Sequence, residues 1–328
     1  MIRGLVLSVV LLATTLLSPV VVHAQQVDLS PRFAVDQPHR FRVVSESVVT
    51  RSIAELEDEQ SQTTKLTYFL TRSVTEVTEE RVVAQLRFDR ILFATQAPNL
   101  LGELEDVVYD TGLLDPETGK VNGRAVLGRG EFVAQQYASV LDPLLGNAIT
   151  LTLDRSGSIL EVEMPEVMGD AEMFSVEMIR DRFLPLFQVH PDGDQIELGS
   201  EWQQKSEQDS GLGFDVVSAT IWSLDDFVDE LASIKVQNEF STGTVRRDTG
   251  ITLRESSGSG NVKWNTKLGV LESLTSAQAI RMAGIPKDLG GGPVELRVRS
   301  RLEIHRSPEP WVLTPKNENS APEPEPDA

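Results

Sequence analysis

Cysteine is absent from this chain of 328 residues. Its absence excludes disulfides, cysteine-ligated zinc, iron–sulfur clusters, thiol nucleophiles and a lipidated N-terminal cysteine. Basic residues are also in short supply, because 30 Lys and Arg stand against 50 Asp and Glu, a formal net charge of −20. Phosphate repels such a surface, so we expect no nucleic acid as a partner. The remaining composition is that of an ordinary globular protein.

Catalytic motifs are missing as well. The histidines beyond residue 24 are His39, His190 and His305, and none has the HExxH or HxH spacing that ligates zinc. No GxSxG nucleophile elbow occurs, and Ser156 and Ser259 lie beside glycine in turn and strand contexts instead. We therefore expect no catalytic residues, no metal and no cofactor, and we predict that the chain is not an enzyme.

The glycine pairs lack the context of a nucleotide site. The pairs at 128/130, 211/213 and 258/260 have no third glycine three residues on and no strand–turn–helix unit around them. Residues 290–293 (GGGP) lack the Lys-Ser/Thr of a phosphate loop. These absences exclude a dinucleotide site and a phosphate loop at those positions.

The N-terminus has the pattern of a secretory signal. Arg3 precedes an apolar run over residues 5–22, which ends in Val22-His23-Ala24. A cation, an apolar core and small residues before the cut predict a signal peptide over residues 1–24, cleaved after Ala24. The alternative is a retained membrane anchor. Export without disulfides or N-glycosylation sequons favours a bacterial periplasmic or extracellular location, with no membrane span after cleavage.

The C-terminal segment is rich in proline and acid. Residues 307–328 read SPEPWVLTPKNENSAPEPEPDA and carry five acidic residues and one lysine. Little in this segment is apolar, so burial cannot offset the loss of chain entropy, and we expect a disordered tail. The acidity of the protein belongs mainly to the folded body, where solubility and self-repulsion are its ordinary effects.

Period-two patterns dominate the body. Residues 40–48, 65–74 and 82–91 alternate apolar and polar side chains and are rich in valine and threonine. Such alternation predicts antiparallel strands with one face exposed to water. Residues 154–157 (DRSG) separate two further apolar stretches and predict a hairpin. Helical spacing is rarer and predicts helices over residues 132–144, 170–187 and 276–282.

The second half repeats the order of features in the first. Residues 214–224 parallel residues 66–77, and residues 265–272 echo residues 154–161. This echo favours an internal duplication, with a first β-rich half over residues 31–188 and a second over residues 189–306. The alternative is that β-meanders of similar composition look alike. The predicted fold class is α+β and mostly β: antiparallel curved sheets in two similar halves with a few amphipathic helices packed on them.

The order of these features resembles an uncharacterised family of secreted bacterial proteins, known as a domain of unknown function. The resemblance rests on an early FRVV strand at residues 41–44, on LTLDRSGSILEVE at residues 151–163, on LGSEW at residues 198–202 and on GSGNVKWNTKLGVLES at residues 258–273. The build is also similar to periplasmic lipoprotein carriers and related lipid-binding proteins, which implies a curved sheet around a helix with an apolar cavity. Those lipoproteins carry an acylated cysteine, which this chain lacks.

Three side-chain groups leave room for binding or chemistry. Asp225, Asp226 and Asp229 could hold calcium, although acids on turns are usually solvated, and paired carboxylates could support glycoside hydrolysis across a cleft. The tryptophans at 202, 222 and 264 could line a groove, or pack in the sheet core. The methionines at 164, 168, 173 and 178 could face a lipid, or pack in the core.

The sequence thus predicts an exported, non-enzymatic binding or envelope-associated protein. Its partner would be a hydrophobic small molecule or an envelope protein. The alternatives are a carboxylate-based hydrolase and a module that binds a protein partner without a ligand cavity.

Overall fold

The computed structural model describes most of the chain outside its two ends. The described residues are 25–53, 58–98, 104–114, 121–126, 141–166, 176–191, 195–209, 214–245, 249–285, 292–309 and 311. The predicted signal peptide over residues 1–24 lies outside them, as does nearly all of the predicted tail.

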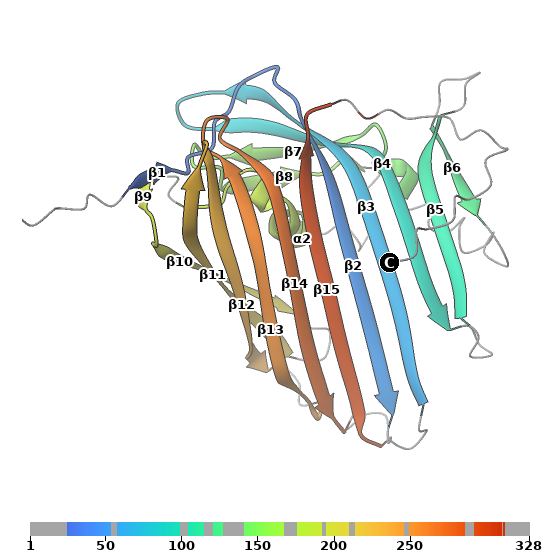
Figure 1. The fold of residues 1–328 in the computed structure, drawn as a ribbon. Helices are drawn as coiled ribbons and strands as arrows, with labels where there is room; N and C mark the ends of the chain where they lie inside the picture. Colours follow the sequence, from blue (N-terminus) through green and yellow to red (C-terminus); the bar gives the residue numbers. More distant parts are fainter. Residues whose placement is uncertain are drawn as a thin grey trace, which may run out of the picture.

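One antiparallel sheet of thirteen strands makes up almost the whole fold. Eleven strands follow one another across it in the order β10-β11-β12-β13-β14-β15-β2-β3-β4-β5-β6, and β7 joins through β4 and carries β8 (Figure 1). Their bounds in chain order are β2 (His39–Ile53), β3 (Asp58–Val77), β4 (Val82–Pro98), β5 (Leu104–Leu114), β6 (Val121–Val126), β7 (Ala148–Leu153), β8 (Ile159–Glu163), β10 (Glu201–Asp209), β11 (Phe214–Val228), β12 (Leu231–Val245), β13 (Ile251–Asn265), β14 (Val270–Gly284) and β15 (Val294–Ser307).

The predicted fold class is wrong, because the protein is nearly all β and has one sheet where two were expected. The last strand of the second half, β15, pairs with β2 of the first half from Val294↔Ile53 to Ser307↔Arg40. An alternating pattern identifies a strand and its buried face, but it does not specify the neighbouring strand. The boundary of the two halves near residue 189 stays a prediction, as does the duplication.

The predicted helices are the other source of the error. Residues 276–282 lie inside strand β14 and form no helix. Over so short a stretch the apolar residues fit both the helical period of 3.6 and the strand period of 2. Pairing with β13 on one side and β15 on the other stabilises the strand. Of the predicted helix over residues 132–144, only residues 141–144 lie within the described residues, and Asp142–Leu144 form the short 3₁₀ turn η1.

The predicted helix over residues 170–187 is present in part. The described part of residues 170–187 contains helix α2 (Val176–Phe183), followed by the 3₁₀ turn η4 (Leu184–Leu186). A small second sheet pairs β1 (Gln26–Asp28) with β9 (Gln195–Glu197). No helix among the described residues is long and apolar enough to cross a membrane.

The hydrophobic core lies between one face of the large sheet and a thin layer formed by β7, β8, α2 and η4. Figure 1 shows this layer behind the upper part of the sheet. Buried residues of β2 to β4 such as Phe41, Tyr68 and Phe88 meet Phe183 from α2 and Leu151 from β7. We call this face of the sheet the inner face and the opposite face the outer face. The strands continue well below the covering layer (Figure 1).

The predicted hairpin at residues 154–157 is confirmed. β7 and β8 pair antiparallel, and Asp154 Oδ1 accepts hydrogen bonds from the backbone N–H of Ser156 and of Ser158, each at 2.9 Å. Gly157 has φ of +92°, a conformation that only glycine adopts easily. The Ser156 hydroxyl donates to Asp154 at 2.6 Å, so this serine stabilises the turn.

Candidate functional site

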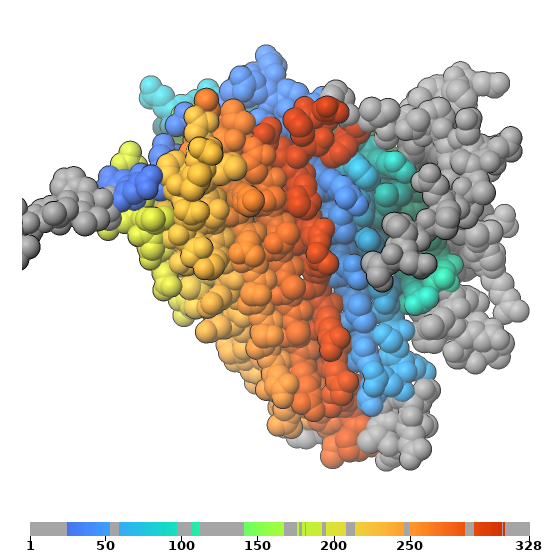
Figure 2. All heavy atoms as spheres, in the orientation of Figure 1, coloured from blue at the N-terminus to red at the C-terminus, as the bar shows by residue number. Residues whose placement is uncertain are grey.

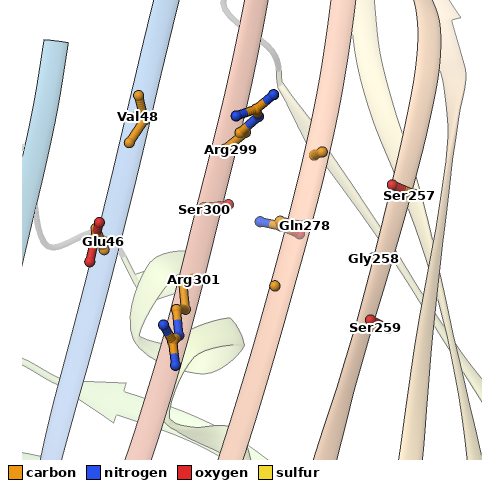
Figure 3. A pocket seen from close by; sticks show the side chains of 11 residues that line it. Glu46, Val48, Ser257, Gly258, Ser259, Gln278, Arg299, Ser300 and Arg301 are labelled. Carbon is orange, nitrogen blue, oxygen red and sulfur yellow. The ribbon is translucent and has the colours of Figure 1, made fainter. Parts of the chain in front are cut away.

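A groove of about 550 Å³ lies on the outer face over β13, β14, β15 and β2. Four small residues form its floor, two from β13 and two from β14, while two arginines of β15 stand at its side (Figure 3). We call it the arginine groove. The side chains that line it on the outer face are Ser257, Ser259, Ala277, Ala279, Arg299, Arg301, Glu46 and Val48.

The alternation of β15 places the arginines on the outer face. Ile304 is fully buried in the core and Leu302 packs against it, so the residues between and beyond them at odd numbers point the other way. Arg297, Arg299 and Arg301 are all exposed. Successive residues of one face are about 6.6 Å apart along a strand, so the three guanidinium groups start from a regular row.

The sheet register assembles the floor beside this row. Arg301 pairs with Ala277, which pairs with Ser259, while Arg299 pairs with Ala279. Short side chains on two adjacent strands leave a depression next to the long arginines. Gly260 contributes from the inner face, because a Cβ there would lie 2.4 Å from the carbonyl oxygen of Thr275, so only glycine lets β13 approach β14 this closely.

A second groove of about 590 Å³ continues the first along the strands. The two share Ser257, Ala279 and Arg299, and the second adds Arg281 and Arg297. Together they form a depression that follows β13 to β15 on a face that Figure 2 shows as a continuous surface from β11 to β3.

The arginines at the lower end of the groove are held by ion pairs with glutamates. Arg281 bonds both Glu255, at 3.1 Å, and Glu295, at 2.9 Å, and Arg297 also bonds Glu295. Hydrogen bonds from both arginines hold the pKa of the Glu295 carboxyl below its usual value, so it stays charged.

The two arginines of the upper part differ in their surroundings, and Glu46 of β2 lies directly across from Arg301. Arg301 pairs with Glu303. Arg299 forms no ion pair or side-chain hydrogen bond with any residue that the structure describes, and it is exposed. An arginine in this state is ready to pair with a carboxylate or another oxyanion from outside the molecule.

The three histidines are not gathered into a site. His305 lies on the outer face beside Arg42, and the ring of His190 packs edge-on to Trp202 at 4.9 Å. His39 lies on β2, where burial and the nearby Arg72 and Arg306 lower its pKa to about 4. No group of three or more acidic or histidine side chains that could hold a metal ion occurs within the described ranges.

Arg72 is the other unusual charge, and its role is structural. Its guanidinium is fully buried, donates a hydrogen bond to the backbone oxygen of Leu186, and lies 5.4 Å from the ring of Phe187 and 6.0 Å from that of Phe41. Burial lowers its pKa to about 10, which leaves it charged at neutral pH. The hydrogen bond to Leu186 and the cation–π contact with Phe187 join the η4 segment to the sheet, and the contact with Phe41 lies within the sheet.

The acidic candidates separate into individual contacts. Asp225 pairs with Lys235 at 2.7 Å, while Asp226 accepts a hydrogen bond from the backbone N–H of Phe227 at 2.8 Å. Asp229 lies in the two-residue turn between β11 and β12 with φ of +51°. Asp225 and Asp226 are exposed residues near the end of β11, and Asp229 is an exposed turn residue, so the calcium interpretation gains no support from these contacts.

The tryptophans belong mainly to the core. Trp264 and Trp222 are buried on the inner face, and Trp202 stacks on Trp222 with ring centroids 6.3 Å apart. Met164 packs against the same core. The methionines at 168 and 173 lie outside the described residues, and Met178 belongs to α2. The upper inner face is therefore filled by core side chains, which is the core-packing alternative for the tryptophans.

Sequence reasoning missed the arginine groove, although a signal for it was present. The segment Arg297-Val298-Arg299-Ser300-Arg301 alternates arginine with smaller residues inside a predicted strand. On its own this pattern is that of a solvated strand face. Only the register adds the small residues of β13 and β14 beside the row.

The comparisons with known proteins identify no family for this chain. No family model matches it, and no curated protein matches it. Among solved structures, lipovitellin from a study of lipid–protein interactions is similar over 84% of this chain and 25% of that chain, with 11% identity and a TM-score of 0.47. This chain thus spans about a quarter of lipovitellin's length.

Two bacterial structures are more distant. An outer-membrane channel from Pseudomonas putida F1 covers 84% of this chain and 97% of its own, with 8% identity and a TM-score of 0.21. A DUF1329 family protein from Desulfovibrio piger ATCC 29098 covers 81% of this chain and 84% of its own, with 12% identity and a TM-score of 0.13. Likeness at this level transfers no function, so the site must be interpreted from its own geometry.

Proposed function

We propose that this chain is an exported, non-enzymatic binding protein that binds an extended acidic peptide segment of a partner protein in the arginine groove. The observation that carries the proposal is Arg299, an exposed arginine without an ion pair among the described residues, beside a floor of serine and alanine. The predicted signal peptide supports export, and the resemblance to secreted bacterial proteins supports a place in or near the envelope.

The geometry favours an extended peptide over a compact ligand. Arg297, Arg299 and Arg301 repeat every second residue along a straight strand. An extended peptide also presents every second side chain on one face at about the same spacing, so acidic residues two apart could meet successive arginines. The small side chains of Ser257 and Ala279 leave room for the peptide backbone.

The same lining argues against hydrolysis. Glu46 is the carboxylate of the first groove and Glu255 that of the second, and Glu255 is already bonded to Arg281. General acid and base catalysis by two carboxylates needs both to flank one substrate bond. Arginine and alanine supply neither role, so binding accounts for the groove better than chemistry does.

Fluorescence anisotropy with a labelled peptide tests this function. The probe alternates glutamate and threonine over ten residues, and an isomer with its glutamates in one block tests the spacing. We expect the alternating peptide to bind more tightly than the isomer, and Arg299→Gln to weaken it about threefold to tenfold, the range of one charged contact. Arg155→Gln is the matched control, because Arg155 is an exposed arginine in the β7–β8 turn. Equal affinity for both peptides, or equal effects of both substitutions, would exclude the site.

A hydrophobic ligand on the lower inner face is a second candidate function. Below the core the inner face continues with half-buried Val49, Val298 and Ile280 and with buried Met282. Such a surface suits an acyl chain or another apolar molecule. Native mass spectrometry of protein purified without detergent would show a bound lipid as a discrete added mass, and a spectrum of the bare chain alone would remove this candidate.

A further inference from the structure

We propose that the chain's own C-terminal segment, residues 312–328, binds in the arginine groove and competes there with the partner peptide. This inference rests on the proposed function, because it names a regulator of the same site. The C-terminal segment contains the sequence PEPEPD at residues 322–327, which has no role in the proposed function itself.

The acids of this segment have the spacing of the arginines. Glu323, Glu325 and Asp327 follow one another at every second residue. Arg297, Arg299 and Arg301 do the same on β15, with opposite charge. Each acid at 323 and 325 precedes a proline, a position at which helical conformations are disfavoured and extended ones are favoured. The segment therefore has the chemistry that the groove is proposed to bind.

The chain leaves the sheet on the correct face for this contact. Beyond Ser307 it turns back, and the ring of Trp311 packs edge-on against that of Phe69 with centroids 5.0 Å apart. Phe69 pairs with Arg42, and Arg42 pairs with His305, so these residues form one row across the outer face. Trp311 thus anchors the segment on the same face as the groove, close to its upper end.

The length of the segment is sufficient. Arg301 lies four residues along β15 from His305, roughly 13 Å, and two strand spacings from β3 add roughly 10 Å sideways. Glu323 follows Trp311 by twelve residues, which span up to roughly 40 Å in an extended, strand-like form. The chain that runs down from Trp311 would place Glu323 near Arg301, Glu325 near Arg299 and Asp327 near Arg297.

The peptide assay tests the competition in the full-length protein. We expect the triple substitution Glu323→Gln, Glu325→Gln and Asp327→Asn to tighten the Kd of the labelled peptide roughly threefold to tenfold, because a tethered competitor is lost. In the Arg299→Gln background the same triple substitution should leave the Kd unchanged. Equal affinity with and without the three acids would overturn the inference and leave the proposed function intact. Absence of peptide binding in both proteins would refute the function itself.

A cysteine pair tests the contact without any added peptide, since the chain has no cysteine of its own. Ala277→Cys with Pro324→Cys should form an intramolecular disulfide under mild oxidation, and the three neutral substitutions should slow its formation. Ser241→Cys with Pro324→Cys is the control, because Ser241 is an exposed residue of the same face on β12. Equal rates for the two pairs, or a disulfide-linked dimer as the main product, would contradict binding of the segment to its own groove.

Discussion

At the scale of single residues, the two buried or half-buried basic groups with the largest downward pKa shifts, His39 and Arg72, lie close to each other. Arg72 is buried without a carboxylate partner among the described residues, and its positive charge helps to lower the pKa of His39. Arg306, which also affects both, is bonded to Glu272 through two hydrogen bonds of 3.0 and 2.6 Å. Glu272, which is held by Arg306, is thus a carboxylate whose charge acts on His39 and opposes the effect of the two arginines.

His39 makes stability depend on pH in this corner. Its pKa is about 4 in the folded protein and 6.5 when unfolded, so protonation below pH 6.5 favours the unfolded chain. Stability from this group is complete above pH 6.5 and is lost as pH falls to about 4. Discounted for solvent at a half-buried site, the loss should be about 1–2 kcal/mol.

Urea unfolding at pH 7.5 and pH 4.5 measures this effect. The wild-type protein should lose about 1–2 kcal/mol more than His39→Gln between the two pH values. The carboxylates titrate equally in both proteins, so the difference between the two losses of unfolding free energy comes from the histidine. An identical loss of unfolding free energy in the variant would show that the pKa of His39 is the same in the folded and unfolded protein.

At the scale of elements, sequence patterns predicted strands well and their partners poorly. The alternation of residues 40–48, 65–74 and 82–91 is confirmed as β2, β3 and β4, and so is the hairpin at Asp154. Neither the pairing of β15 with β2 nor the strand at residues 276–282 was foreseen. The arginine groove depends on that pairing, because Glu46 and Val48 reach it only from β2. A contact between distant segments leaves no trace in a local pattern.

Gly157 provides a prediction for the β7–β8 hairpin. A Cβ at this position would lie 2.4 Å from the carbonyl oxygen of Phe187, and its φ of +92° is strained for any other residue. Gly157→Ala should therefore destabilise the protein by about 2–4 kcal/mol, from backbone strain and the clash together.

Gly146→Ala is the matched control for that substitution. Gly146 has φ of +72°, but its Cβ would meet nothing within 4 Å. It should cost only about 1 kcal/mol in chemical denaturation, from the backbone conformation alone. Equal costs for the two variants would mean that the contact between the hairpin and Phe187 is not tight.

At the scale of the whole molecule, the continuous sheet makes the two halves one unit. Fourteen consecutive residue pairs join β15 to β2, from Val294 to Ser307, and the core cluster includes residues of both halves, such as Phe41 and Trp264. We expect cooperative unfolding in one transition. In a Trp311→Phe background all tryptophans lie at residues 202, 222 and 264, so every fluorescent probe belongs to the second half. Its midpoint should coincide with that of far-UV circular dichroism, and two separated midpoints would indicate independent domains.

The same scale explains the binding surface. A chain with a net charge of −20 repels acidic partners at long range, so an acidic segment can bind only where arginine is concentrated. The row of Arg297, Arg299 and Arg301 on β15 is the place that we propose for this binding. The proposed regulation by residues 312–328 uses the same attraction within one molecule.

Charge reversal across the groove tests the central claim most directly. Arg299→Glu should weaken binding of the alternating glutamate peptide by at least tenfold at low salt, and a peptide with one central glutamate changed to lysine should bind this variant better than it binds the wild-type protein. Arg155→Glu should change neither affinity. If the lysine peptide gains nothing from Arg299→Glu, the acidic segment does not bind at this arginine and the account is contradicted.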